Sequence, residues 1–232
     1  MQRLLLFDID GTLIRMRRGF GAPAVFGVFA DMFNVEIPAD FTHDCSGKTD
    51  LWIFLEIASR FDVGRDEVFN RAVEIRERVE AVQAAECRPD TVQVLPGVRE
   101  VLNILNGERG ITLGLLTGNM EGAGFAKLRP HALDLFFRFG AFGSDHHLRN
   151  ELPPIALKRA QDLHPGIDFA PERSLIIGDT HRDIECARAG GMKAAAVATG
   201  RFNAEELGRH APDALFNDLS ADDTAELLLR LL

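Results

Sequence analysis

The sequence has few cysteines and no long uncharged apolar run, and both shortages restrict where the protein can act. Three of the 232 residues are cysteine, and Cys45, Cys87 and Cys186 lie far apart in the chain. An odd number of distant cysteines predicts free thiols, which are typical of a reducing cytoplasm. Because no stretch of about 20 uncharged apolar residues occurs, we expect no membrane-spanning helix. The first apolar run is short and soon becomes acidic, so we expect no secretory signal and a cytoplasmic location.

Positive charge is also in short supply. The chain has 26 lysines and arginines against 35 acidic residues, which gives a formal net charge of -9. This balance argues against nucleic acid as the main partner, since duplex binding depends on basic patches. It leaves room for a small phosphorylated molecule, which needs only local positive charge. The hydrophobic content of 46% and the chain length allow one or two domains and leave monomer and homodimer both open.

Short apolar runs alternate with helical patterns along most of the chain. The runs are apolar throughout, which is typical of a parallel sheet covered by helices on both faces. We therefore expect an α/β fold with a doubly wound parallel sheet, similar to a Rossmann core. The expected strands are Arg3–Phe7, Ile111–Leu116, Phe137–Phe142, Ser174–Ile177, Lys193–Val197 and Ala214–Phe216. The expected helices are Val98–Asn106, Gly124–Lys127 continuing past a proline, Pro154–Leu163 and Asp183–Ala189.

One segment interrupts this alternation. Between Gly19 and Val92 the periodicities are helical, over Pro23–Phe33, Asp50–Phe61 and the long Arg65–Glu86. We interpret the segment as a helical cap inserted after the first strand. The expected division is a catalytic core of residues 1–14 and 93–232, with the cap at 15–92.

Two carboxylates follow the first strand directly. Asp8 and Asp10 come after Leu4-Leu5-Leu6-Phe7, two positions apart, so an extended chain would project them to the same side. Desolvating a carboxylate is costly unless a cation or hydrogen-bond donors compensate it. A hard divalent cation bound by oxygens is the natural partner for such a pair.

Other polar groups follow the later strands. In an open parallel sheet, ligands bind beyond the carboxyl ends of the strands, so these groups are expected at one edge. Helix capping is the alternative explanation for Thr117-Gly118-Asn119, and a first-turn acid for Asp183. The groups in question are Thr117, Gly118 and Asn119 after the second strand, Arg149 after the third, and Asp179 and Asp183 after the fourth.

Three motifs resemble those of the haloacid dehalogenase-like hydrolase superfamily. They are Asp8-Ile9-Asp10-Gly11-Thr12-Leu13, Leu116-Thr117-Gly118-Asn119 and Ile177-Gly178-Asp179-Thr180-His181-Arg182-Asp183. The resemblance covers the whole chain, and the helical insert resembles the C1 cap of that superfamily. The tail segments Val197–Gly200 and Asp218–Ser220 are similar to the phosphoglycolate phosphatase-like branch.

The resemblance implies a catalytic role for each motif. Asp8 would attack phosphorus and form an aspartyl-phosphate, and Asp10 would act as general acid and then as general base. Mg²⁺ would be bound by the Asp8 carboxylate, the Asp10 backbone carbonyl and Asp179, with Asp183 in support. Phosphate oxygens would be held by Thr117, by backbone N–H groups of Gly118 and Asn119, and by N–H groups near Gly11 and Thr12.

The sequence departs from the superfamily at its basic residue. The superfamily usually has Lys-Pro upstream of the last motif, and this sequence has no Lys-Pro. Arg149, expected at the edge of the sheet, and Lys158, one turn into the following helix, are the two candidates, and position favours Arg149. Within the cap, Lys48 either meets a carboxylate or second phosphate of the substrate or is a solvated loop lysine.

We therefore predict a Mg²⁺-dependent phosphatase of a small organic phosphate monoester, similar to the phosphoglycolate phosphatases. One alternative is a sugar phosphomutase with the same aspartyl-phosphate chemistry, which Thr12 disfavours. A second is a 2-haloacid dehalogenase, whose chemistry produces no alkoxide that would need Asp10. A third is a non-enzymatic binding module, which is disfavoured because Asp8, Asp10, Asp179 and Asp183 are all kept.

Overall fold

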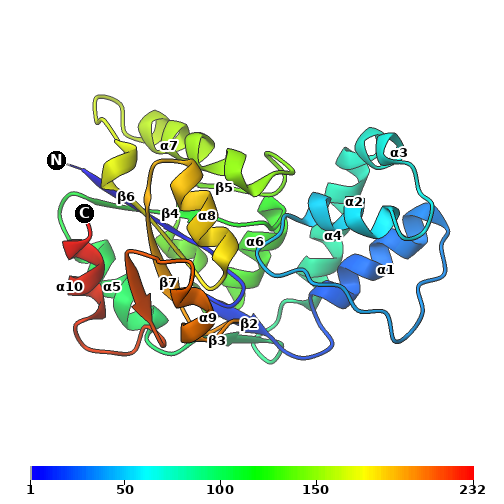
Figure 1. Ribbon diagram of the computed structural model, residues 1–232, viewed down its shortest axis with the longest axis horizontal. Helices are drawn as coiled ribbons and strands as arrows, with labels where there is room; N and C mark the ends of the chain where they lie inside the picture. The colour runs from blue at the N-terminus through cyan, green and yellow to red at the C-terminus, as the bar shows by residue number, and fades with distance from the viewer. Residues whose placement is uncertain (1) are drawn as a thin grey trace.

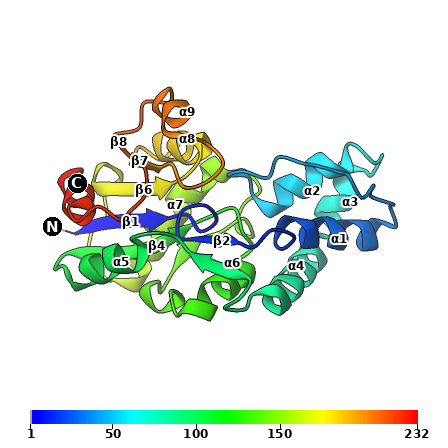
Figure 2. The ribbon, with the colours of Figure 1, turned by 90° about the horizontal axis from the view of Figure 1, so that it is seen from below.

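A six-stranded parallel sheet forms the centre of the larger part of the molecule. The computed structural model describes residues 2–232, with the sheet and its helices on one side and a helical cap on the other (Figures 1 and 2). The strands lie in the order β5-β4-β1-β6-β7-β8 and all pairs are parallel. Their bounds are β1 (Arg3–Phe7), β4 (Ile111–Leu116), β5 (Gly140–Ala141), β6 (Ser174–Gly178), β7 (Lys193–Val197) and β8 (Ala214–Phe216). The predicted doubly wound α/β fold is confirmed.

Helices cover both faces of this sheet because the last four residues of its central strand β1, Leu4 to Phe7, are all apolar and buried. Leu5 and Phe7 pack with α5 (Val98–Gly107) and α10 (Thr224–Arg230) on one face. Leu4 and Leu6 pack with α7 (Leu152–Leu163) and α8 (His181–Ala189) on the other. Each fully buried side chain of this kind contributes about 1.5–3 kcal/mol. β1 is therefore fixed at the middle of the sheet, and the residues that follow it have a rigid support.

The cap is a separate helical layer with its own hydrophobic cluster. It consists of α1 (Ala22–Phe33), α2 (Asp50–Ala58), α3 (Arg65–Asn70) and α4 (Ala72–Glu86), seen at the right of Figure 1. Phe29 and Phe54 are fully buried at its centre, with their ring centroids 5.5 Å apart. α4 also packs against α6 (Glu121–Leu128) of the core. The helical cap expected from the sequence is present, and the exact division at residues 14–15 and 92–93 stays a prediction.

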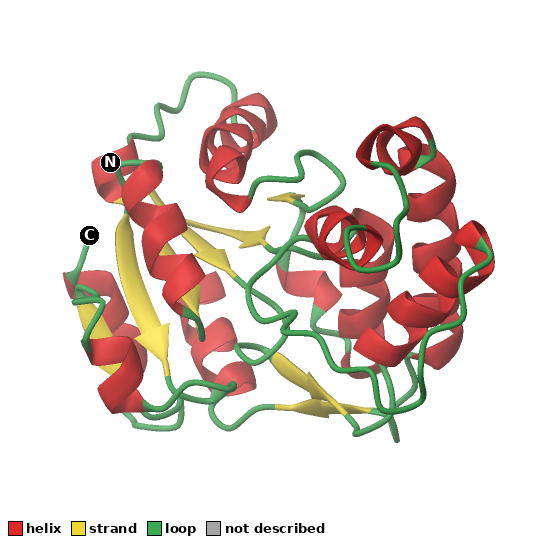
Figure 3. Cartoon of the chain, turned by 45° about the vertical axis from the view of Figure 1, so that its right-hand side comes forward, coloured by secondary structure: helices red, strands yellow, loops and turns green. Residues whose placement is uncertain are grey.

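A short antiparallel ribbon joins the two parts. The chain leaves the core through β2 (Ile14–Met16) and returns through β3 (Val92–Val94), which lie side by side between the sheet and the cap (Figure 3). Gly21, at the start of α1, is tied to α4 by two hydrogen bonds. Its N–H donates to Glu86 at 3.0 Å, and its carbonyl accepts from Gln83 at 3.2 Å. This ribbon was not predicted, because three-residue strands have too little periodicity to be recognised.

Several predicted elements differ from the structure in their bounds, and three differ substantially. The strand expected at Phe137–Phe142 is reduced to Gly140–Ala141, because Phe137 is buried against Phe7 with ring centroids 6.0 Å apart and precedes the paired segment. The helix expected at Arg65–Glu86 is broken at Arg71 into α3 and α4. α6 ends at Leu128, and the proline that follows lies in a 3₁₀ turn, Arg129–His131, since its missing N–H cannot continue an α-helix.

No helix within residues 2–232 is both long enough and apolar enough to cross a membrane.

Candidate active site

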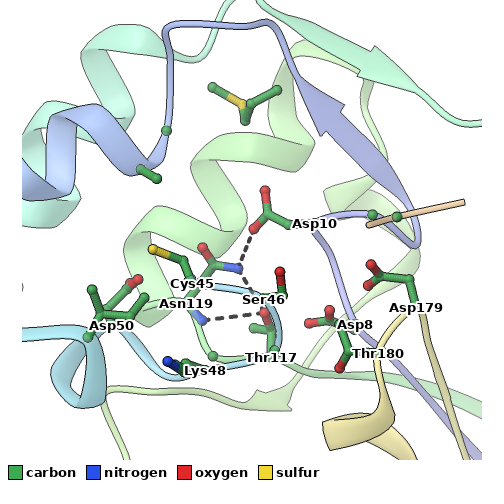
Figure 4. Close-up of a pocket in the computed structure, with 18 of the residues that line it drawn as sticks. Asp8, Asp10, Cys45, Ser46, Lys48, Asp50, Thr117, Asn119, Asp179 and Thr180 are labelled. Atoms are coloured by element: carbon green, nitrogen blue, oxygen red, sulfur yellow. Dashed lines mark hydrogen bonds between the residues drawn. The ribbon is translucent and has the colours of Figure 1, made fainter. Parts of the chain in front are cut away.

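Polar residues that follow three neighbouring strands meet in one cavity between the core and the cap. Asp8 follows β1, Thr117 follows β4, and Asp179 follows β6, and β1 lies between the other two strands (Figure 4). The cavity has a volume of about 470 Å³. It is lined by the strand-end residues on one side and by cap residues such as Lys48 and Asp50 on the other. The expectation that the strand ends converge is borne out by this arrangement.

Three carboxylates form a compact buried cluster at the base of the cavity. One oxygen each from Asp8, Asp179 and Asp183 lies within 4.8 Å of the others, and all three residues are buried. Burial, reinforced by the neighbouring carboxylates against the opposing effect of Arg149, raises the pKa of Asp8 to about 6. Burial and the charges of Asp183 and Asp8 raise the pKa of Asp179 well above its ordinary value. Both shifts mean that the surrounding protein compensates the ionised forms of these carboxylates only in part.

Arg149 supplies the compensating charge within the described chain. Its side chain is 6% exposed, its Nη2 lies 3.2 Å from Oδ1 of Asp8, and it also donates a hydrogen bond to Asp183. Nη1 donates to the cap carbonyl of Gly47 at 3.2 Å. Burial opposes the charge of this guanidinium, but Asp183 and Asp8 outweigh burial and raise its pKa. One arginine thus faces three carboxylates and also contacts the cap.

Asp183 has a structural role as well as its place in the cluster. Its Oδ2 accepts hydrogen bonds from the backbone N–H of Thr180 at 3.0 Å and from the Thr180 hydroxyl at 2.7 Å. The bond from the Thr180 N–H, together with one from the Asp183 N–H to the Thr180 hydroxyl oxygen at 3.3 Å, forms a capping box at the start of α8. Asp183 is therefore an acid in the first turn of α8, as the alternative explanation for it expects, and its other oxygen still faces Arg149. This fits a residue that supports the site from just outside.

Glycines allow the backbone to pass close to Asp179. A Cβ on Gly11 would lie 2.3 Å from Asp179 Oδ2, and a Cβ on Gly200 would lie 1.6 Å from it. Gly11 also has φ +84°, which favours glycine. Its own N–H donates to the carbonyl of Ile14 at 2.8 Å, so it is not free for a phosphate oxygen. Thr12 is fully buried, and its hydroxyl lies 3.4 Å from Asp179 Oδ1. Both residues lie against the carboxylate cluster, and Gly11 also lines the cavity. Their expected contact with phosphate stays a prediction.

The Asp10 carboxylate stands apart from this cluster. Its Oδ2 accepts from Lys127 Nζ at 2.7 Å and from Asn119 Nδ2 at 2.9 Å. Asn119 also donates to the hydroxyl oxygen of Thr117 at 2.8 Å (Figure 4). Lys127 is buried, and the charges of Asp10 and Asp50 raise its pKa although burial opposes them. A metal contact of Asp10 would have to come from its backbone, as the sequence analysis expects, and that contact stays a prediction.

The cap contributes Lys48 and Asp50 to the cavity wall. Lys48 Nζ binds Glu56 at 2.6 Å, and the same carboxylate accepts from Trp52 Nε1 at 2.8 Å. Asp50 is buried, which raises its pKa to about 6, and its Oδ2 accepts from the Met120 N–H at 2.9 Å. The Asp50 N–H in turn donates to the Gly118 carbonyl at 2.9 Å. The first turn of α2 is thus bonded to the core loop that carries Thr117 and Asn119.

Gly118 is required by the close approach of these two loops. A Cβ at this position would lie 1.9 Å from the Lys48 carbonyl oxygen, which leaves no room for a side chain. The Gly118 N–H has no acceptor among the described residues. It is available for a ligand in the cavity, and the phosphate contact expected of it stays a prediction.

The structure separates the two candidates for the basic residue. Arg149 lies at the carboxylate cluster, whereas the Lys158 side chain is 75% exposed and pairs with Asp162 at 2.7 Å on the surface of α7. The prediction that Lys158 is a candidate for binding phosphate is therefore wrong, because Lys158 lies on the solvent face of its helix. Sequence reasoning also missed Lys127 and Asp50, which line the cavity.

The donor set of the cluster fits a hard divalent cation. All the available atoms are carboxylate oxygens, the ligands that Mg²⁺ and similar ions prefer. Three buried acids against one arginine leave an excess of negative charge that a dication would neutralise. The residues present therefore fit a divalent metal, with Asp8, Asp179 and Asp183 as the residues that would surround it.

Comparison with known proteins is consistent with this geometry. Residues 2–191 match the family model described as haloacid dehalogenase-like hydrolase. Phosphoglycolate phosphatase 1 of Pseudomonas aeruginosa is 26% identical, over 99% of this chain and 83% of that protein. Pyrophosphatase PpaX of Anoxybacillus flavithermus is 27% identical, over 93% of each chain. A solved β-phosphoglucomutase of Clostridium difficile has a TM-score of 0.69 at 17% identity, over 100% and 97% of the two chains, and shows the same fold.

Proposed function

Because the chain belongs to the haloacid dehalogenase-like hydrolase family, we propose that it hydrolyses a small organic phosphate monoester through an aspartyl-phosphate on Asp8. One observation carries the proposal. Asp8 lies buried in a cavity beside a guanidinium and two further carboxylates, at the ends of adjacent parallel strands. The phosphatase names of its relatives support the same reaction class.

The first half of the reaction transfers the phosphoryl group to the protein. A carboxylate oxygen of Asp8 forms a bond to phosphorus while the bond from phosphorus to the ester oxygen breaks. Asp10 gives a proton to the departing oxygen, which leaves as an alcohol. The side chain of Asp10 is 42% exposed in the cavity, so it is accessible to a leaving group.

The second half restores Asp8. A water molecule gives a proton to Asp10 and attacks phosphorus, and the bond between phosphorus and the Asp8 oxygen breaks to release inorganic phosphate. Asp10 ends protonated and Asp8 ends as a carboxylate, so both are ready for the next substrate. Thr117, the free N–H of Gly118 and the guanidinium of Arg149 hold the phosphoryl oxygens in both halves.

We infer that the metal is Mg²⁺, held by Asp8 and Asp179 with Asp183 in support and the backbone of Asp10 as a further oxygen. When bound, Mg²⁺ would neutralise the negative charge that otherwise opposes attack of one anion on another. The local charge excess at the carboxylate cluster supports this assignment.

The cap side of the cavity would receive the leaving group. Lys48 and Arg15 both line it, and either cation suits a carboxylate such as that of a phosphoglycolate-like substrate. The relatives named phosphoglycolate phosphatase support this substrate class. A cavity of about 470 Å³ is also large enough for a longer ester.

A screen of phosphate monoesters with Mg²⁺ tests the proposed function. We expect release of inorganic phosphate, with the highest kcat/KM for a small carboxylate-bearing or hydroxylated ester. Chelation should stop turnover, and added Mg²⁺ should restore it. Isomerisation of a sugar phosphate without phosphate release would identify a phosphomutase instead. Undiminished turnover in excess chelator would contradict the metal assignment.

The dependence of metal stabilisation on pH is a second expected result. The raised pKa values of Asp8 and Asp179 mean that the metal-free folded protein binds more protons than the unfolded chain above about pH 4. Their contribution to stability therefore falls as the pH rises through about 6. Mg²⁺ favours the ionised carboxylates, so saturating Mg²⁺ should raise the Tm by about 5 °C or more near pH 7.5 and by much less near pH 5. Equal shifts at both pH values, measured by thermal denaturation against a chelated sample, would contradict the assignment.

A further inference from the structure

Lys127 is a buried cation that the proposed reaction does not use. It lies in the last turn of α6, its side chain is 7% exposed, and it lines the cavity. Its ammonium group is 2.7 Å from Asp10 Oδ2 and 2.6 Å from Asn119 Oδ1. A lysine this deeply buried has lost most of its hydration, so these two partners must replace it. The ammonium group of Lys127 is therefore stabilised by specific contacts with Asp10 and Asn119.

The ammonium group determines which way the Asn119 amide faces. Lysine can only donate, so the Asn119 atom that faces it must be the carbonyl oxygen Oδ1. Nδ2 is then directed to Asp10 Oδ2 at 2.9 Å and to Thr117 Oγ1 at 2.8 Å. Without the lysine, the amide could rotate and present an acceptor to the Asp10 carboxylate instead. Lys127 thus acts on Asp10 directly and also through Asn119.

Both contacts reach the same oxygen of Asp10. Oδ2 accepts from Lys127 and from Asn119, whereas Oδ1 accepts no hydrogen bond from any residue in 2–232. The Asp10 side chain is partly exposed to the cavity (Figure 4). One oxygen is therefore anchored by two donors, and the other remains free to exchange a proton with a bound molecule.

We propose that Lys127 is the positioning residue of the general acid, which holds Asp10 Oδ2 directly and through Asn119 so that Oδ1 faces the leaving-group oxygen. This inference rests on the proposed function, since it requires that Asp10 protonates a leaving group. It concerns only the delivery of the proton and leaves the phosphoryl acceptor Asp8 untouched.

Esters with different leaving groups distinguish a defect in proton delivery from a general loss of structure. An alkoxide needs a proton from Asp10 as the ester bond breaks, whereas p-nitrophenolate leaves readily without one. We expect Lys127→Met to lower kcat/KM for an alkyl phosphate by about 100-fold, and for p-nitrophenyl phosphate by about threefold. The ratio of the two losses is the readout, because damage to the fold or to phosphate binding lowers both values together.

Two further variants complete the design. Lys158→Met is the matched control, since Lys158 is an exposed lysine paired with Asp162, and it should leave both values at the wild-type level. In an Asp10→Asn background, adding Lys127→Met should leave the ratio unchanged, because the acid has already been removed. Should methionine reduce the folded fraction, Lys127→Gln keeps one donor in place and is judged by the same ratio.

Different experimental results would overturn the role of Lys127 and the proposed function. A wild-type protein that releases no phosphate from any ester would overturn the function. A wild-type protein that is active, with Lys127→Met lowering both esters by the same factor or lowering neither, would overturn only the role of Lys127. The role of Lys127 would also be overturned if Lys127→Met changed the ratio of the two losses in the Asp10→Asn background by as much as it does in the wild type.

Discussion

Replacement of Asp8 with asparagine should abolish phosphate release while leaving the fold intact. Asp8 lies at the carboxyl end of β1, buried, with Arg149 3.2 Å from its Oδ1. An amide of the same shape is a far weaker nucleophile and cannot be regenerated as a carboxylate. We expect kcat to fall by about 10⁴-fold or more, as for other groups that form a covalent intermediate. Release of inorganic phosphate from the best ester of the screen measures it.

The same variant should not be destabilised. Asp8 belongs to a cluster with more negative than positive charge, so its removal lessens repulsion between Asp8, Asp179 and Asp183. Its Tm in chelator should equal or exceed that of the wild type. Asp162→Asn is the matched control, because Asp162 is an exposed partner of Lys158, and it should retain full activity. Unaltered turnover in Asp8→Asn would remove Asp8 as the phosphoryl acceptor.

The sequence predicts well those parts of the fold whose structure is determined by the local pattern of apolar and polar residues. β1 and β4 have the bounds that the sequence predicts, because each is a buried, largely apolar run that is followed by a polar residue. The site follows from the same rule, since parallel strands bring Asp8, Thr117 and Asp179 to one edge. The ends of the strands are therefore sufficient to predict which core residues lie together in the cavity.

Local rules failed where packing overrode propensity. The phenylalanines at 136–139 favour a strand, yet Phe137 packs on Phe7, and only Gly140–Ala141 pairs with β4. The break at Arg71 has a comparable cause: its side chain donates to the carbonyl of Met32 and binds Glu74, which holds it between α1 and α4. Neither contact can be read from the periodicity of its own segment.

Lys127 and Lys158 show why the complete site could not be predicted. Each is a lysine on an amphipathic helix, and solvation on the outer face is the usual expectation for either. In the structure Lys158 lies outside, whereas Lys127 is buried against Asp10 and Asn119. The difference depends on how α6 and α7 are rotated about their axes against the sheet and the cap. That rotation is a tertiary property with no signal in the sequence of the helix alone.

Replacement of Arg149 with methionine should cause the largest loss of stability among these changes. The arginine is 6% exposed, and its contacts include Asp8, Asp183 and the cap carbonyl of Gly47. Methionine fills similar volume but leaves three buried carboxylates without a cation. Breaking a buried charge pair from one side typically costs about 3–5 kcal/mol, so we expect Tm to fall by about 10 °C or more in chelator near neutral pH. Thermal or urea unfolding measures the loss.

Magnesium then distinguishes a charge effect from a packing effect. If lost charge causes the instability, a dication at the carboxylate cluster should restore part of it, so Mg²⁺ should raise the Tm of Arg149→Met by more than it raises the wild-type Tm. Arg149→Lys keeps the charge but loses the fork that reaches several oxygens at once, so its stability should lie between the two. Activity should stay low in Arg149→Met even with Mg²⁺, because the guanidinium that faces the phosphoryl oxygens is gone. If Mg²⁺ raises both Tm values equally, Arg149 is held there by packing, and the charge balance assigned to this cluster is incorrect.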